Sequence, residues 1–265
     1  MGNAKLLMEY KAMTNQIQKA NFGKRTAAWL FDGILTGILA VAFGVLLSWL
    51  LGYDGYSQTL EKAYDHYESQ YGVTFEMSLE QYEAMTEAEQ ENYNEAYNAL
   101  IADTQAMQAY NMMISLTMVI VSIGILLALV LWEFIMPLWF GHGRTLGKKI
   151  FGLCLIRNDG VKMNTMQLFT RSILGKYSIE TMIPVLILLM IFWGTMGILG
   201  PVVLFALGAG QLAGVLFTRH NCAIHDLLAG TVVADYASQT IFESTEDLIE
   251  YQKKLAAERA SRAPY

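Results

Sequence analysis

The sequence contains a run of 38 residues without a single charge, from Thr181 to Thr218. Two further charge-free runs extend from Gly33 to Tyr53 and from Thr104 to Trp132. A helix rises about 1.5 Å per residue, so about 20 apolar residues cross the ~30 Å hydrocarbon core of a bilayer. Only 16% of the residues are charged, well below the share of about 25% in soluble domains. These runs predict an all-α integral membrane protein.

The three runs predict four transmembrane helices in one bundle. The run from residue 181 is too long for one helix, even a tilted one, and the Gly200-Pro201 pair predicts a turn at about residues 197–201. A single span plus a re-entrant segment has the same composition and stays open as an alternative. The predicted division is an amphipathic N-terminal segment 1–24, helix 25–51, insert 52–110, helix 111–140, loop 141–176, two helices in 177–218 and a C-terminal segment 219–265.

Lysine and arginine are concentrated on one side of the predicted helices. The loop 141–176 has seven basic residues and one acid, whereas the insert 52–110 has one lysine and twelve acids. Cytoplasmic loops of membrane proteins carry the excess of lysine and arginine. We therefore expect both termini in the cytoplasm. We also expect the basic loop to contact anionic headgroups of the lipid bilayer.

The insert is acidic and contains nine of the fourteen tyrosines. The sequences Ser78-Leu-Glu-Gln81 and Thr86-Glu-Ala-Glu89 have the form of capping boxes. We expect two or three extracellular helices, the last continuing directly into the next transmembrane helix. The tyrosines at helical spacing favour a small helical hat that packs on itself and on the membrane interface. An extracellular recognition cap with its own ligand stays open as the alternative.

The basic loop begins with Gly141-His-Gly-Arg-Thr-Leu-Gly-Lys-Lys149. It does not fit a phosphate-binding loop, because the glycine spacing is one residue too short and Lys149 stands where serine or threonine is needed. Residues 150–156, a turn at 158–160 and residues 161–163 are typical of a short β-hairpin. Cys154 and Cys222 lie on the cytoplasmic side in this topology, so we expect reduced thiols.

Four short motifs flank the predicted helices. They are Arg25-Thr-Ala-Ala-Trp-Leu-Phe-Asp32, then Arg144 to Leu153 with Gly147 and Lys148, Arg171-Ser-Ile-Leu174, and His225-Asp226-Leu-Leu-Ala-Gly230. Together they resemble the RDD family of bacterial integral membrane proteins over residues 20–51 and 111–236. Arg25, Asp32 and Asp226 match the arginine and two aspartates that name the family. The resemblance implies a bacterial cell membrane and transport of an unknown ligand, with sodium/proton exchange proposed for some members. The insert departs from the minimal family pattern.

Each predicted helix places a polar residue near its cytoplasmic end. At about 1.5 Å per residue, these residues lie roughly 6–12 Å inside the membrane. An ionisable residue at that depth is costly unless it faces the bundle and finds a partner. We therefore expect an internal polar layer formed by Arg25, Asp32, Glu133, Glu180 and Gln211.

Two roles of this layer stay open. In the structural role, Asp32 and Glu133 pair with Arg25, Arg144 or Arg171 and lock the helix packing. In the functional role, Asp32 and Glu133 form a carboxylate site for a cation or proton, because crowded acids raise one pKa toward neutrality. The nearby arginines favour the structural role.

The sequence does not predict an enzyme. His225-Asp226 resembles the start of a metal-dependent phosphohydrolase site, but the chain has only four histidines and no clustered metal-ligand spacing. We expect Asp226 to cap a short segment or to pair with a loop arginine, and we expect no cofactor, metal or nucleic acid. The sequence favours a small transporter or cation/proton exchanger, which with four spans needs a homo-oligomer. A non-transporting scaffold or sensor is the alternative.

Overall fold

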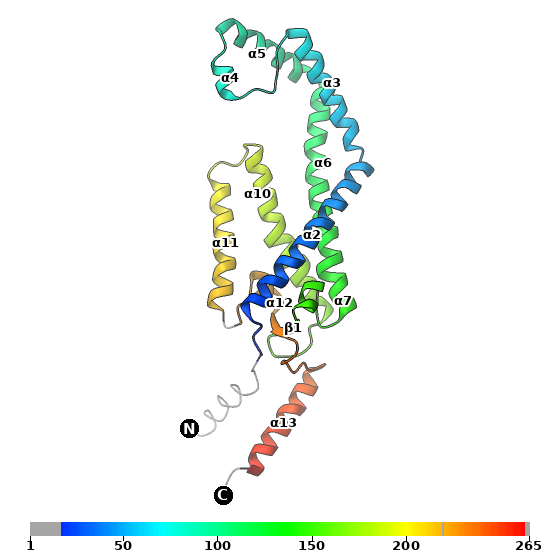
Figure 1. The fold of residues 1–265 in the computed structure, drawn as a ribbon, viewed down its shortest axis with the longest axis vertical. Helices are drawn as coiled ribbons and strands as arrows, with labels where there is room; N and C mark the ends of the chain where they lie inside the picture. Colours follow the sequence, from blue (N-terminus) through cyan, green and yellow to red (C-terminus); the bar gives the residue numbers. More distant parts are fainter. Residues whose placement is uncertain (1–16, 219, 263–265) are drawn as a thin grey trace. The chain divides into compact units, whose positions relative to one another are not determined.

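The computed structural model describes residues 17–218 and 220–262 (Figure 1). The predicted amphipathic segment lies mostly outside these residues. Four helices are long and apolar enough to cross a membrane, over residues 22–50, 104–140, 165–192 and 199–217. The predicted all-α membrane fold with four spans is therefore confirmed. Residues 177–218 contain portions of two separate helices, joined by residues 193–198, as the first of the two alternatives predicts.

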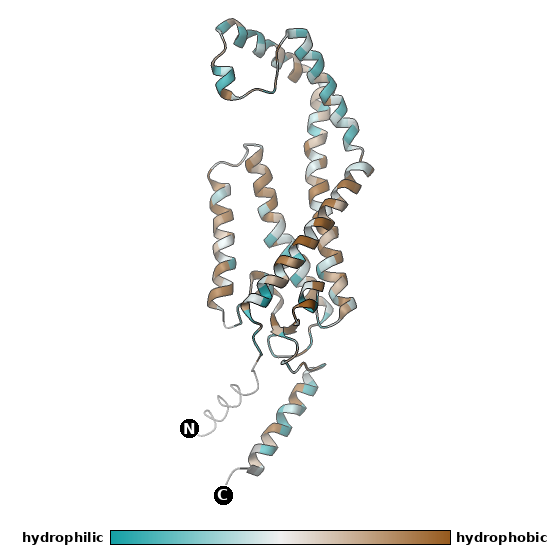
Figure 2. Ribbon diagram, viewed as in Figure 1, coloured by the Kyte–Doolittle hydropathy of each residue, from teal (hydrophilic) through white to brown (hydrophobic). Residues whose placement is uncertain are grey.

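The elements of the spans differ sharply in hydropathy from those of the insert. The first two spans are α2 (Phe22–Leu50) and α6 (Thr104–Leu129), the latter continued by η1 (Val130–Ile135) and α7 (Met136–Phe140). The last two contain α9 (Thr165–Phe169), η2 (Thr170–Met182), α10 (Ile183–Phe192) and α11 (Leu199–Phe217). The insert contains α3 (Tyr53–Tyr71), α4 (Leu79–Glu83) and α5 (Glu87–Ala102). In Figure 2, α10 and α11 are mostly brown, whereas α3 is largely teal.

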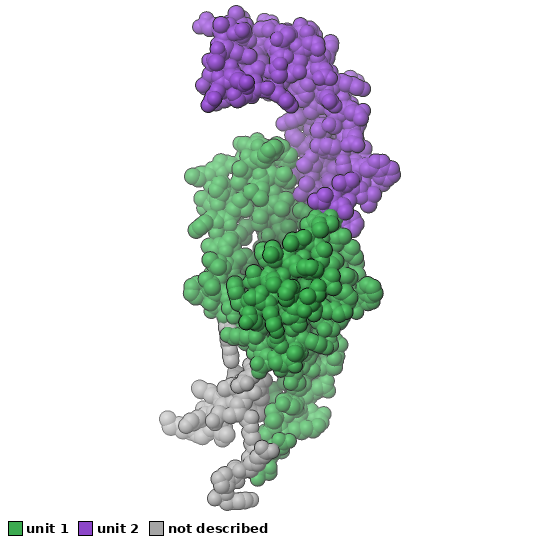
Figure 3. All heavy atoms as spheres, viewed as in Figure 1, with its two compact units in different colours: residues 1–40, 125–265 green, residues 41–124 purple. Residues whose placement is uncertain are grey.

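The chain divides into two compact units (Figure 3). Unit 1 comprises residues 1–40 and 125–265, and unit 2 comprises residues 41–124. Both α2 and α6 contribute to each unit. Unit 1 also contains α8 (Leu146–Ile150), β1 (Leu153–Arg157), α12 (Ile224–Ala229), β2 (Thr231–Asp235) and α13 (Thr245–Arg262).

In unit 2, both predicted capping boxes form, at the starts of α4 and α5. The last helical segment of the predicted insert, residues 104–110, continues directly into the second span as part of α6, whereas α5 ends before it. Asp103 breaks the helix with an extended backbone, and its Oδ1 accepts from the N–H groups of Gln105 and Ala106 at 2.8 and 3.2 Å. This side chain gives α6 an N-terminal cap of its own, so the helix that contains the second span begins at Thr104, ahead of the predicted bound at residue 111.

The helix that contains the third span begins at Thr165, ahead of the predicted bound at residue 177. Asn164 starts it with a capping box, in which its side chain accepts from the N–H of Gln167 and the Gln167 side chain accepts from the N–H of Asn164. Arg171 and Lys176, which the sequence assigns to the basic loop, therefore lie on the helix. Both are tolerated there because buried acids neutralise them, as described below.

The two-stranded sheet connects distant segments of unit 1. β1 pairs antiparallel with β2, with Leu153 opposite Asp235 and Arg157 opposite Thr231. The predicted hairpin is limited to the turn at residues 158–160 and one antiparallel bridge between Ile156 and Lys162, where the N–H of Arg157 donates to the Val161 carbonyl at 2.9 Å. Both faces of the sheet are buried. On one face, Cys154 packs in a cluster with Ile156 and Val232. On the other face, Leu153, Leu155 and Val233 pack with Ala28 of α2. Because both faces are buried, β2 is a continuous apolar run and lacks the alternation of apolar and polar residues that marks a half-buried strand. The sequence pattern therefore did not predict it.

Candidate functional site

Unit 1 contains a cavity of about 750 Å³, lined by residues of α2, η1, α8, η2, α11 and α12. Small-molecule sites typically occupy about 300–1,000 Å³. Four acidic and four basic side chains line the cavity: Asp32, Glu133, Glu180, Asp226, Arg25, Lys148, Arg171 and Lys176. The opposite charges balance in number, so their pairing decides what the site can do.

Asp32 on α2 is 3% exposed and is held by hydrogen bonds from three sides. It accepts from Trp132 Nε1 at 3.0 Å, from Thr145 Oγ1 at 2.5 Å and from the N–H of Gly147 at 2.9 Å. The close approach requires glycine at residue 147. A Cβ there would lie 2.7 Å from the carbonyl oxygen of Ala28 and 2.8 Å from the Asp32 carboxylate. Asp32 therefore fastens the start of α8 to α2.

Lys148 on α8 lies between two buried carboxylates. Its Nζ is 3.5 Å from Glu133 Oε2, 3.8 Å from Asp32 Oδ2 and 3.1 Å from Thr145 Oγ1. Glu133 also pairs with Lys176, so two lysines share this acid. Burial lowers the pKa of Lys148 to about 8, because loss of water disfavours the ammonium more than the nearby carboxylates favour it.

Asp226 on α12 joins arginines from two different helices. Arg171 NH1 pairs with Asp226 Oδ1 and donates to Thr231 Oγ1 at 3.2 Å, while Arg25 NH2 lies 3.8 Å from Asp226 Oδ2. Asp226 Oδ2 also accepts from the N–H of Ala223 at 3.2 Å, which caps α12. Asp226 thus both caps a short helix and pairs with an arginine, although Arg171 belongs to a membrane helix rather than to a loop.

His225 connects α12 to η2. Its Nδ1 lies 2.7 Å from Glu180 Oε2, its Nε2 lies 3.0 Å from Arg171 NH2, and its N–H donates to Glu180 Oε1 at 2.8 Å. Arginine only donates, so Nε2 accepts and Nδ1 donates to Glu180. Burial, together with the charge of Arg171, lowers the pKa of His225 to about 3, so the ring is neutral at physiological pH. Next to this pair, Gln211 Oε1 accepts from the N–H of Ile224 at 3.2 Å.

The winding of η2 brings its charged residues to the cavity. In an α-helix of 3.6 residues per turn, Arg171 would point about 140° away from Lys176 and about 180° away from Glu180. η2 is a π-helix of 13 residues, and the N–H that follows it, of Ile183, bonds to the carbonyl of Ser178. Bonding across five residues aligns side chains that an α-helix would separate. All three charged side chains therefore line the cavity.

The structure brings the predicted site residues together in this one place. The cavity is lined by Arg25, Asp32, Glu133, Glu180, Gln211, Lys148, Arg171, His225 and Asp226, with Gly147 directly beside Asp32. The expected pairing of Asp32 and Glu133 with arginines is wrong, because lysines reach them instead. The Arg144 guanidinium lies 4.3 Å from the centre of the Tyr236 ring. The two carboxylates are thus bridged by Lys148 rather than crowded against each other.

Sequence reasoning missed four residues that build the site. Lys176 pairs with Glu133, Ser172 Oγ donates to the Glu133 carbonyl at 2.7 Å, and Thr145 and Trp132 hold Asp32. One signal was available for Thr145, since a threonine before a short helical run is a typical N-cap. For Trp132 and Ser172 the local sequence holds no such signal.

A model of the RDD family matches residues 19–230, a range that includes all eight charged residues of the cavity. The chain belongs to the RDD family. Membership confirms the resemblance of the four motifs, and the RDD arginine and aspartates are among the cavity residues. No curated protein and no solved structure matches the chain. Among the residues that the structure describes, no three histidine, cysteine, aspartate or glutamate side chains are grouped to hold a metal ion.

Proposed function

We propose that this RDD-family protein is a small secondary transporter that exchanges one monovalent cation for one proton. The observation that supports it is the buried Lys148 between Asp32 and Glu133, in a cavity of a membrane-spanning bundle. Ionisable residues inside such bundles are typical of ion pathways and proton relays.

The charge balance of the cavity supports a one-to-one exchange. With Lys148 protonated, the acidic and basic side chains of the cavity cancel. Release of the Lys148 proton leaves one negative charge, which one monovalent cation neutralises. The oxygens of Asp32, Glu133 and Thr145 that surround the ammonium then face the cation, and oxygen is the ligand that hard cations prefer. Proton and cation therefore compete for one place.

The pKa of Lys148 supports operation near neutral pH. At a pKa of about 8, roughly a tenth of the side chains are neutral at pH 7 and half at pH 8. Asp32, Glu133, Lys176 and Arg171 are the charged groups that act on it. We expect cation-driven proton flux to rise as the pH increases through about 8.

Flux measurements in proteoliposomes test the proposal, with a pH-sensitive dye inside and sodium, potassium or choline chloride outside. Lys148→Arg cannot release its proton and Lys148→Gln carries none, so both reduce the flux to that of empty liposomes. Asp32→Asn and Glu133→Gln remove cation ligands and are expected to do the same. Lys149→Gln alters the exposed neighbouring lysine and retains wild-type flux. Wild-type flux in Lys148→Arg contradicts the proposal.

A non-transporting scaffold or sensor is the second candidate. The observation in its favour is the saturation of Asp32 by three donors of the chain itself, which suits a structural clasp. Absence of sodium- or potassium-driven flux in folded wild-type protein favours this candidate. In that case the acidic insert and its ligand become the first subjects of a search for partners.

The proposal includes a location in the bacterial plasma membrane with both termini in the cytoplasm and no enzyme activity. The positive-inside distribution of the sequence supports the orientation. Several basic residues of residues 141–176 have internal partners, such as Arg157 with Asp159 at 2.5 Å and Lys162 with Glu243 at 2.6 Å. Lys149 is exposed, so it is the candidate for contact with anionic headgroups.

A further inference from the structure

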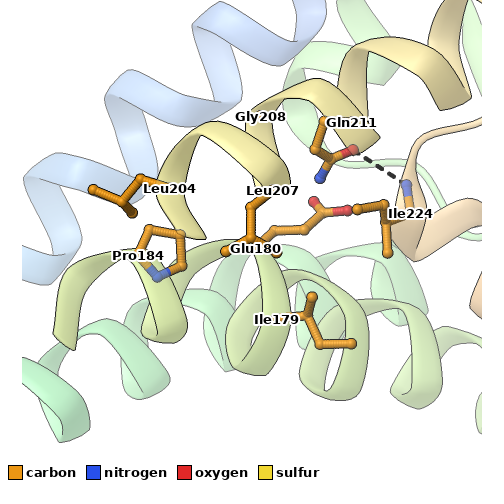
Figure 4. Close-up of a pocket in the computed structure, with 8 residues that line it drawn as sticks. All are labelled: Ile179, Glu180, Pro184, Leu204, Leu207, Gly208, Gln211 and Ile224. Carbon is orange, nitrogen blue, oxygen red and sulfur yellow. Dashed lines mark hydrogen bonds between the residues drawn. The ribbon is translucent and has the colours of Figure 1, made fainter. Parts of the chain in front are cut away.

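A second cavity of about 190 Å³ lies between η2, α10, α11 and the start of α12 (Figure 4). Pro184, Leu204 and Leu207 are among its apolar walls. Glu180, Gly208 and Gln211 line both this pocket and the 750 Å³ cavity, so they form the junction between the two. In Figure 4, the Glu180 side chain extends below Gln211 toward Ile224.

Glu180 differs from the other three acids of the main cavity. Asp32, Glu133 and Asp226 each have a lysine or arginine nitrogen within 4.0 Å. Of the described residues, only His225 offers Glu180 a basic nitrogen within that distance, and this ring is neutral at physiological pH. The charge of Glu180 is therefore hydrogen-bonded but not cancelled by an adjacent cation.

We propose that Glu180 and Gln211 form a second binding site for a monovalent cation, at the junction of the two cavities. A carboxylate and an amide oxygen are ligands that hard cations prefer. Gln211 Oε1 accepts one hydrogen bond from Ile224 and keeps a second lone pair. The apolar walls of the smaller pocket lower the local dielectric constant, which strengthens the attraction between the carboxylate and a cation.

The site gives a transported ion its next position beyond Lys148. An ion that leaves the oxygens of Asp32 and Glu133 meets the Glu180 carboxylate, which has no lysine or arginine of the described residues directly beside it, and this carboxylate also lines the pocket beside α10 and α11. This role in transport rests on the proposed function. The binding site itself rests only on the geometry of the junction, so the two are tested separately.

Cation-dependent thermal unfolding of the purified protein tests the site. A ligand that binds only the native state raises the unfolding midpoint as its concentration increases. The measurement uses sodium or potassium chloride against choline chloride at equal ionic strength, in the Lys148→Arg variant, whose first site stays occupied by the arginine charge. In Lys148→Arg, we expect sodium or potassium to raise the unfolding midpoint. This rise should disappear when Glu180→Gln is added to Lys148→Arg. No rise in Lys148→Arg overturns the inference.

A second variant covers the case in which Glu180→Gln fails to fold. A Cβ at Gly208 meets nothing within 4 Å, so Gly208→Cys fits without a clash. In the Lys148→Arg background, an aminoethyl methanethiosulfonate reagent places a positive charge at the junction and abolishes the rise, whereas a methyl reagent leaves it. Gly37→Cys, equally open but in neither cavity wall, is the matched control.

The outcomes separate the inference from the proposed function. A rise that persists with the cationic reagent overturns the second site, even where Lys148-dependent flux is intact. Conversely, a rise that the cationic reagent removes supports the site even if liposomes show no flux. Wild-type protein treated with both reagents controls for Cys154 and Cys222, which are buried and whose thiol pKa values are raised by burial.

Discussion

The insert of unit 2 and the cavity of unit 1 distribute charge in opposite ways. In the insert, Phe75 contacts the rings of Tyr64, Tyr93 and Tyr97, with centroids 5.6, 5.8 and 6.5 Å apart. Of the described residues, every buried polar or charged side chain belongs to unit 1. Water lets the insert keep its charges exposed while its partly buried rings pack against one another. In the hydrocarbon of a membrane the charged groups lie inside instead, because an ionisable group is tolerated there only within the bundle and in a pair.

The comparison predicts the largest loss of stability where a buried acid of unit 1 is neutralised. Asp226→Asn leaves Arg25 and Arg171 without their shared carboxylate. We expect a cost of about 3–5 kcal/mol, as is typical when one partner of a buried ion pair is removed. Thermal unfolding in detergent measures it. Asp235→Asn, which alters the exposed pair with Lys24, should cost less than about 1 kcal/mol. Equal losses in the two variants contradict the comparison.

In the insert the largest loss should come from an aromatic ring. Phe75→Ala removes three ring contacts and should cost about 2–3 kcal/mol, less than a fully buried phenylalanine because Phe75 is only half-buried. Hydrogen exchange should accelerate in α3 to α5 and stay unchanged in β1 and β2. Leu79→Ala, at a side chain that is 73% exposed, is the control with little expected effect. Faster exchange in the sheet of unit 1 would show that the ring acts beyond the insert.

Replacing a glycine by alanine should change stability in opposite directions in the two units. Gly147→Ala places a Cβ against Ala28 and Asp32, and the resulting overpacking should cost about 1–3 kcal/mol. Gly55→Ala in α3 meets nothing within 4 Å and should stabilise its helix by about 0.5–1 kcal/mol. Unfolding midpoints of the two variants should therefore move in opposite directions. A neutral Gly147→Ala variant would mean that α8 is not fastened tightly to α2.

The smallest effect is expected for a charge on the insert surface. Glu91→Gln, at an exposed residue of α5, should change stability by no more than about 0.5 kcal/mol. The same substitution at Glu133 leaves Lys148 and Lys176 without their shared acid and should be many times more costly. Thermal unfolding of both variants side by side measures the ratio. Equal stability losses in Glu133→Gln and Glu91→Gln would contradict the difference between the buried charges of unit 1 and the exposed charges of the insert.

Local sequence predicts the spans and the polar layer because charge-free runs and buried acids are local properties. It fails at the start of the third span, since Arg171 and Lys176 resemble loop residues when each charge is considered alone. Their burial depends on Asp226 and Glu133, which are far away in the sequence. The π winding of η2 hides the same residues, because a pattern analysed at 3.6 residues per turn scatters them over different faces.

The strand pairing shows a second limit of local sequence. The residues around the turn at 158–160 predict a hairpin, and that turn forms. The register of β1 is instead set by β2, which follows two membrane helices later. Cys154 and Leu155 find their partners only when the whole of unit 1 is assembled, and no short window contains that information.

That pairing also has a consequence for biogenesis. At about 5–20 residues per second, the roughly 70 residues between β1 and β2 take about 4–14 s to synthesise. During this time the third and fourth described spans enter the bilayer. β1 meanwhile has an unpaired edge, which other chains can join. The strand that completes the sheet, β2, leaves the ribosome only after the fourth of the described spans. Completion of the sheet thus reports that these four spans have been made, and a chain stalled before residue 231 exposes an open strand to the quality-control machinery of the cell.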